Sequence, residues 1–134
     1  MSNGDSPIQI VLDTNRYTDL QRGEPSVVGL LEAVDELLIP FVVVAEIRVG
    51  YSLGRRAREN ELYLTRFLSQ PHVTVLLPDL QTINGYAALY RQLRQQGTPI
   101  PHHDVWIAAL ALQHDAALYS RDGRFEVIPQ LRLI

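Results

Sequence analysis

Apolar and polar residues alternate in blocks along this chain, and the blocks predict strands that alternate with helices. Short runs that are crowded with apolar residues and bounded by polar segments are typical of buried strands. In the longer segments between them, apolar residues recur every three or four positions, as they do on one face of a helix. We predict strands at residues 8–13, 37–39, 73–77, 117–119 and 131–134, and helices at residues 25–37, 41–53, 55–69, 79–93 and 104–113.

Strands that alternate with helices indicate an α/β protein with a parallel sheet covered on both faces. The segment around Pro40 is ambiguous, because the β-branched run at residues 42–44 also suits a strand. We interpret it as a strand at residues 37–39, before the proline, and a helix at residues 41–53 that is stopped by Gly54. Residues 1–7 are small and polar and are expected to form a loose tail. The whole chain, residues 1–134, is expected to be a single domain.

Composition narrows the function classes. The 134 residues include no cysteine, which excludes disulfides, thiolate metal sites and cysteine nucleophiles. The formal net charge of −3 argues weakly against a dedicated nucleic-acid binder but leaves room for an enzyme with a local basic patch. The N terminus does not resemble a signal peptide, and no apolar run reaches the length of a membrane span. We therefore expect a cytoplasmic protein.

Two acidic residues stand in unusual settings. Asp13 directly follows the first predicted strand, and ligands of open parallel sheets bind at the carboxyl ends of strands. Capping of a helix that starts near Thr14 is the alternative role. The helical neighbours of Glu46 are all apolar: Val42, Val43, Val49 and Gly50. We therefore expect Glu46 on the buried stripe of its helix, where a carboxylate needs a partner or a metal. Partial exposure of that stripe, or pairing with an arginine, is the alternative.

Two further acids are ambiguous when each is considered alone. Asp104 precedes a helix that is apolar on all sides and would suit its N-cap, while Asp122 precedes Gly123 as in many turns. Together, however, four converging carboxylates raise one another's pKa values, and a hard divalent cation removes that conflict. Oxygen ligands without cysteine suit Mg²⁺ or Mn²⁺ rather than zinc. Such ions activate water and stabilise charge on a phosphodiester under attack.

Four segments, in their order and spacing, resemble the successive motifs of PIN-domain proteins, above all the VapC-type toxins of bacterial toxin–antitoxin pairs. They are LDTN at residues 12–15, AEIRVG at 45–50, DVWIAALAL at 104–112 and SRDGRFEVIPQLRLI from residue 120. The resemblance covers nearly the whole chain. It implies a three-layer α/β/α sandwich around a short, mainly parallel sheet, and endonucleolytic cleavage of RNA that depends on Mg²⁺ or Mn²⁺.

The same resemblance implies roles for individual residues. It carries catalytic and metal-binding roles onto four acids, each of which stands in its motif: Asp13, Glu46, Asp104 and Asp122. Asn15 and Ser120 would support the site beside the first and last acids. The resemblance also implies a homodimer, RNA as the substrate and a small cognate antitoxin protein that occludes the site. No membrane partner is expected.

The remaining candidates are basic residues near the acids. Arg121 and Arg124 flank the fourth acid and could hold an RNA phosphate or an antitoxin carboxylate, a solvated turn being the alternative. We interpret His102 and His103 as loop residues rather than proton carriers. The alternative function is a catalytically silent PIN-like module or a receiver-like regulatory module that uses Asp13. The absence of any lysine argues against a receiver.

Overall fold

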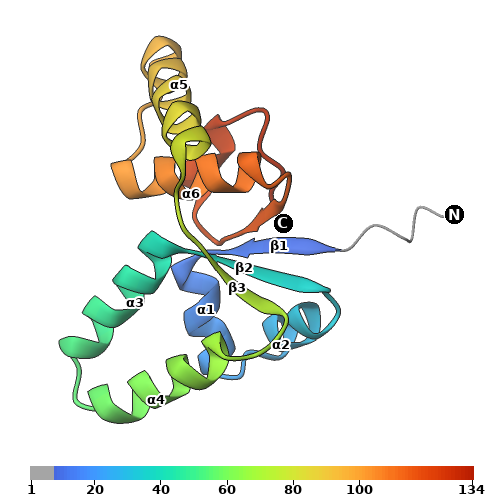
Figure 1. Ribbon diagram of the computed structural model, residues 1–134, viewed down its shortest axis with the longest axis vertical. Helices are drawn as coiled ribbons and strands as arrows, with labels where there is room; N and C mark the ends of the chain where they lie inside the picture. The colour runs from blue at the N-terminus through green and yellow to red at the C-terminus, as the bar shows by residue number, and fades with distance from the viewer. Residues whose placement is uncertain (1–7) are drawn as a thin grey trace, which may run out of the picture.

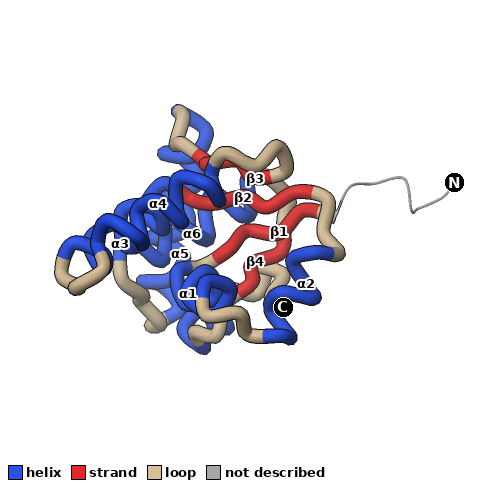
Figure 2. Tube along the Cα trace, turned by 90° about the horizontal axis from the view of Figure 1, so that it is seen from below, coloured by secondary structure: helices blue, strands red, loops and turns tan. Residues whose placement is uncertain are grey.

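A four-stranded parallel sheet forms the centre of the computed structural model, which describes residues 8–134. The strands are β1 (Gln9–Leu12), β2 (Glu36–Pro40), β3 (Val73–Leu76) and β4 (Ala117–Tyr119). They lie side by side in the order β3-β2-β1-β4 (Figure 2). This confirms the predicted parallel sheet. The strand predicted at residues 131–134 is wrong, because Leu133 forms only an isolated bridge with Leu118. The tail predicted for residues 1–7 lies outside the described residues.

Helices cover both faces of the sheet, which confirms the three-layer α/β/α fold (Figure 1). One layer holds α1 (Thr14–Gln21), α2 (Pro25–Glu32), α3 (Phe41–Ser52) and α4 (Ala57–Leu68). The other holds α5 (Leu80–Gln96), α6 (His102–Gln113) and the short 3₁₀ helix η2 (Gly123–Val127). Apolar side chains from both layers are fully buried against the sheet, among them Leu64 and Ile107. Among the helices of residues 8–134, none is both long and apolar enough to cross a membrane.

The predicted helices are correct in kind but differ in their ends. α2 ends at Glu32 rather than residue 37, because the chain has already entered β2 at Glu36. α4 begins at Ala57 rather than residue 55. α6 begins at His102, so it includes two residues that we predicted to be in a loop. The segment around Pro40 is a strand followed by a helix, as predicted, but the strand includes Pro40 rather than ending before it.

Two strands lead into helices almost without a loop, and this fixes side chains at the carboxyl edge of the sheet. Asp13 alone separates β1 from α1, and Pro40 is both the last residue of β2 and the N-cap of α3. The φ of −58° at Pro40 suits entry into a helix, and its missing N–H would have no helical partner there. The first turns of α1 and α3 are therefore held in a set orientation to the sheet.

The sheet contains a switch in direction at β1. The chain passes from β1 to β2 and β3 on one side and returns on the other side as β4. In open α/β sheets, connections that leave neighbouring strands in opposite directions create a crevice at the carboxyl ends of those strands. Asp13 follows β1 and Ser120 follows β4, so these two residues flank the crevice.

Candidate active site

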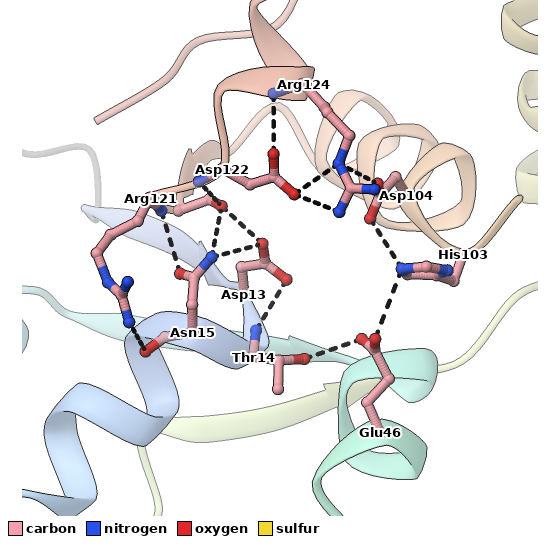
Figure 3. A network of polar contacts seen from close by, with 10 residues as sticks. Asp13, Thr14, Asn15, Glu46, His103, Asp104, Arg121, Asp122 and Arg124 are labelled. Atoms are coloured by element: carbon pink, nitrogen blue, oxygen red, sulfur yellow. Dashed lines mark hydrogen bonds and ion pairs between the residues drawn. The ribbon is translucent and has the colours of Figure 1, made fainter. Parts of the chain in front are cut away.

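A hollow of about 220 Å³ lies at this carboxyl edge (Figure 3). Eight residues line it: Asp13, Thr14, Asn15, Glu46, His103, Asp104, Asp122 and Arg124. The structure thus brings the four acids that the sequence singled out around one hollow. Each acid is supplied by a different part of the fold: the end of β1, α3, α6 and the segment after β4.

Asp13 is held by neutral hydrogen-bond donors. One oxygen, Oδ1, accepts from the backbone N–H of Thr14 at 2.8 Å and so caps α1. The other, Oδ2, accepts from Ser120 Oγ at 2.6 Å, and Asn15 Nδ2 lies 3.5 Å away. Only 6% of Asp13 is exposed. The capping role and a place in the site are therefore compatible, because both belong to the same carboxylate.

The two residues expected to support the site join β1 to β4. The hydroxyl oxygen of Ser120 accepts hydrogen bonds from the backbone N–H of Asp122 at 3.0 Å and from Asn15 Nδ2 at 3.3 Å. Asn15 Oδ1 accepts from the backbone N–H of Arg121 at 3.1 Å. Because these bonds link residues that are far apart in sequence, they fix the separation of the first and fourth acids.

Asp104 is the most deeply buried of the four acids, with 2% exposed. It lies in the first turn of α6, whose N-cap is Pro101, so the expectation that Asp104 caps this helix is wrong. Burial raises the pKa of its carboxyl, His103 and Arg124 oppose that shift, and Asp13 adds to it. Within residues 8–134, its buried Oδ2 accepts no hydrogen bond, although Arg124 Nε lies 3.4 Å away. At that distance the two atoms form an ion pair without hydrogen-bond geometry.

Glu46 stands at the rim of the hollow. Its side chain is 38% exposed, and its helical neighbours Val49 and Gly50 are exposed as well. The expectation of a fully buried stripe is therefore wrong, because no other element within residues 8–134 buries this part of α3. Glu46 is nevertheless held in place: Oε1 accepts from Thr14 Oγ1 at 2.9 Å, and Oε2 lies 3.5 Å from Nε2 of His103.

Asp122 and Arg124 form a closely bound pair. Asp122 Oδ1 accepts from the backbone N–H of Arg124 at 2.9 Å, which caps η2. Asp122 Oδ2 accepts from Nε of Arg124 at 2.8 Å and from its Nη2 at 2.5 Å. These bonds hold the pKa of Asp122 below its ordinary value. The turn interpretation and a place in the site are again compatible.

Arg121 points away from the hollow. Its Nε and Nη2 donate to the two oxygens of Asp19 at 2.9 and 3.1 Å. The hydrogen bonds from Arg121 are the largest influence that lowers the pKa of Asp19. This guanidinium is therefore paired with a carboxylate outside the lining of the hollow, whereas Arg124 is paired with Asp122 inside it.

His103 is a residue of the hollow to which the sequence analysis gave no role. Its Nε2 lies 3.2 Å from Asp104 Oδ1 and 3.5 Å from Glu46 Oε2, so the ring bridges two acids from different helices (Figure 3). The loop interpretation is wrong, since His103 lies in the first turn of α6. In the sequence, the feature that could have indicated a role for His103 is its position next to Asp104.

The donor set of the hollow suits a hard cation. Carboxylate oxygens are the preferred ligands of Mg²⁺ and Mn²⁺, and the unpartnered Oδ2 of Asp104 is the kind of atom that such an ion would satisfy. In the arrangement that residues 8–134 adopt, no three His, Asp or Glu side chains are grouped closely enough to share a metal ion. Arg124 and His103 stand between the carboxylates (Figure 3). The oxygen donors are therefore of the type that a hard cation binds. The side chains of Arg124 and His103 lie between them.

Comparison with known proteins agrees with this fold. The sequence profile of the PIN domain matches residues 10–131. The chain is 31% identical over 127 residues to a protein named Ribonuclease VapC1 from Haemophilus influenzae strain R2866, covering 91% of this chain and 93% of that protein.

Two solved structures share the fold throughout. One is VapBC2 from Rickettsia felis bound to a DNA fragment from its promoter, with a TM-score of 0.85, 26% identity and coverage of 95% of this chain and 98% of that one. The other is VapBC-1 from nontypeable Haemophilus influenzae, with a TM-score of 0.84, 26% identity and coverage of 95% and 97%. The chain therefore belongs to the PIN-domain family, among its VapC proteins.

Proposed function

We propose that this protein is a metal-dependent endoribonuclease that acts as the toxin of a toxin–antitoxin pair. It would hydrolyse RNA phosphodiester bonds at the site formed by Asp13, Glu46, Asp104 and Asp122. The observation that carries the proposal is a buried carboxylate oxygen of Asp104, without a hydrogen bond in the described chain, in a hollow lined by three more carboxylates. Burial of that group is costly unless a ligand uses it.

The four carboxylates would hold Mg²⁺ or Mn²⁺. The bound ion would supply activation of water and stabilisation of charge on the phosphate. The chain's own residues have separable tasks. Ser120 and the N–H of Thr14 orient Asp13, so its lone pairs are fixed before anything binds. Glu46 is half-buried at the rim and hydrogen-bonded by Thr14, which suits it to orient a water molecule that enters from solvent.

Substrate and partner are inferred from the relatives. A protein that is 31% identical is named a ribonuclease, which supports RNA as the substrate. The two solved structures described above are VapBC assemblies, and VapBC is described as a family of toxin–antitoxin systems. This supports a cognate antitoxin. Homodimer formation is part of the proposal. The exposed apolar side chains of Leu77, just after β3, and of Leu80 and Ile83, in the first turn of α5, offer a surface for it.

The test is RNA cleavage by the purified protein and its Asp13→Asn variant in buffers with Mn²⁺, Mg²⁺ or EDTA. We expect the wild type to cleave RNA with Mn²⁺ or Mg²⁺ and not with EDTA, and D13N to lose more than about 100-fold in rate. Mutation of a residue that only hydrogen-bonds to a metal ligand already reduces metal affinity or activity by about 10- to 100-fold. Asp115→Asn is the matched control, because Asp115 is an exposed aspartate away from the hollow whose φ of 50° asparagine tolerates.

Undiminished cleavage by D13N would contradict the site assignment. Cleavage that persists in EDTA would contradict the metal dependence. If the wild type cleaves no RNA yet binds its cognate antitoxin, the chain is a silent PIN-like module.

A further inference from the structure

We propose that Arg124 is an internal counter-ion of the site, which leaves its carboxylates when a divalent cation binds and then contacts an RNA phosphate. This inference rests on the proposed function, since it concerns the same cation and the same substrate. It assigns to one arginine the coupling of metal binding to substrate binding.

The first argument is the charge of the hollow. Four carboxylates line it, and among the described residues the basic side chains in its lining are Arg124 and His103. Arg124 makes the shortest of their contacts, at 2.5 Å to Asp122 Oδ2, and it also lies 3.4 Å from Asp104 Oδ2. Like charges this close are mutually destabilising unless a cation lies among them. Arg124 therefore does, for Asp122 and Asp104, what a divalent cation would do.

The second argument is that the guanidinium can leave without unfolding the turn. Asp122 Oδ1 is bound by the backbone N–H of Arg124, whereas Oδ2 is bound by its side chain. The cap of η2 therefore persists when the side chain moves. The side chain of Arg124 is 51% exposed, so departure into solvent is unobstructed on that side. Its movement releases one oxygen of Asp122 and one of Asp104, the two that now face it.

The third argument is the contrast with Arg121, which lies in the same segment and has the same charge. Arg121 is 50% exposed, but both of its hydrogen-bonding nitrogens are taken by Asp19, outside the lining of the hollow. Arg124 can therefore compete with a cation for the carboxylates of the hollow, whereas Arg121 cannot. This gives a natural matched control.

Once released, the guanidinium of Arg124 lies at the rim of a hollow that would receive a phosphodiester. Guanidinium groups bind phosphate through paired hydrogen bonds. Metal binding and RNA binding should then strengthen each other, because each favours the same displaced position of Arg124.

The experiment compares wild type, Arg124→Gln and Arg121→Gln in two binding measurements that need no cleavage. Mn²⁺ affinity is measured without RNA by calorimetry and by electron paramagnetic resonance. Affinity for a non-cleavable RNA is measured by fluorescence anisotropy in Mn²⁺ at concentrations that saturate each protein. Circular dichroism melts check that all three proteins fold.

We expect R124Q to bind Mn²⁺ about tenfold more tightly than wild type, because a competing charge-assisted contact is lost. We expect R121Q to change Mn²⁺ affinity by less than about threefold, through long-range charge alone. The same R124Q protein should bind RNA about tenfold more weakly than R121Q does. Opposite changes in two affinities from one substitution distinguish this role from a merely structural one.

Equal or weaker Mn²⁺ binding by R124Q relative to R121Q overturns the counter-ion role. Tighter Mn²⁺ binding with undiminished RNA binding overturns the phosphate contact. Both outcomes leave the proposed function standing, provided that the wild type binds Mn²⁺. Failure of wild type and R124Q alike to bind Mn²⁺ overturns the proposed metal dependence and this inference with it.

Discussion

Asp13 and Asp104 line the same hollow and are both buried, with 6% and 2% exposed. Their charges are nevertheless balanced in different ways. Asp13 is surrounded by neutral donors, the N–H of Thr14 and the hydroxyl of Ser120. Asp104 instead faces His103 at 3.2 Å and Arg124 at 3.4 Å.

The difference separates a fixed half of the site from a half that can change partners. Hydrogen bonds from backbone and small polar side chains orient Asp13 whatever else is bound. A long, exposed arginine balances the charge of Asp104 but leaves one buried oxygen unsatisfied within the described residues. The orientation of the Asp13 carboxylate is thus fixed before a cation binds. The free oxygen of Asp104 gains a partner only when a cation binds.

The substitution with the largest expected effect, and the strongest test of this difference, is at Asp104. Asp104→Asn should reduce RNA cleavage by more than about 100-fold, as D13N does, because both remove a proposed ligand. Their effects on stability should differ in sign. Burial raises the pKa of Asp104, so its ionised form weakens the fold at neutral pH and asparagine should raise the Tm. D13N should lower the Tm, since charge-assisted bonds worth about 1.5–3 kcal/mol are weakened.

Thermal melts of the three proteins in EDTA at neutral pH measure this difference. Asp115→Asn again controls for the loss of one negative charge. If D104N and D13N both lower the Tm by similar amounts, the two carboxylates are supported alike and the comparison fails.

A smaller effect concerns the neutral support of Asp13. Ser120→Ala removes the donor at 2.6 Å and the acceptor of the Asp122 N–H. We expect kcat/KM for RNA to fall by about 10- to 100-fold, the usual cost of removing a partner of a metal ligand. Ser120→Thr keeps the hydroxyl and should recover most of the rate. An equal loss in both variants would show that space around residue 120, rather than its hydroxyl, matters.

The smallest effect tests a capping aspartate that has no part in the hollow. Asp79 caps α5 by accepting from the N–H of Thr82 at 3.0 Å. This bond is the main cause that lowers the pKa of Asp79, so its stabilisation is present above the ordinary range of an aspartate and is lost as pH falls through the lowered folded value. Asp79→Ala should therefore lower the Tm by a few degrees at pH 7.

That deficit of D79A against wild type should narrow when melts are repeated at progressively more acidic pH. RNA cleavage should not change, in contrast to the capping aspartates of the site. Asp79→Asn retains the acceptor and should melt close to wild type. A loss of cleavage in D79A would mean that capping alone accounts for the effects at Asp13.

Much of the fold could be predicted from the sequence, because strand and helix boundaries are marked by short runs of neighbouring residues. The apolar run before Asp13 and the break at Pro40 place β1, β2 and the start of α3 correctly. Residues 131–134 were expected to form a strand from their apolar residues, yet pairing requires a neighbour along several residues, and only Leu133 finds one. Periodicity placed Glu46 on a buried face because it shows which residues share a side, not whether another element covers that side.

The candidate site, like the fold, could be predicted only in part from the sequence. The positions of the acids relative to strands and helices could be predicted, since each lies at a recognisable boundary or motif. The different roles of Arg121 and Arg124 could not, because they depend on Asp19 and Asp104, which come from distant parts of the chain. His103 was missed for the same reason, as its second partner, Glu46, lies on another helix.

The direct passage from β2 into α3 has a consequence for how this protein tolerates change in length. Successive residues of a helix are turned by about 100° around its axis. With no loop between Pro40 and Phe41 to absorb an added residue, the angular position of Glu46 is set by counting from the strand. One residue inserted or deleted between Pro40 and Glu46 would turn that carboxylate away from the hollow and remove its contacts with Thr14 and His103. At this junction, the number of residues matters to the site as well as their identity.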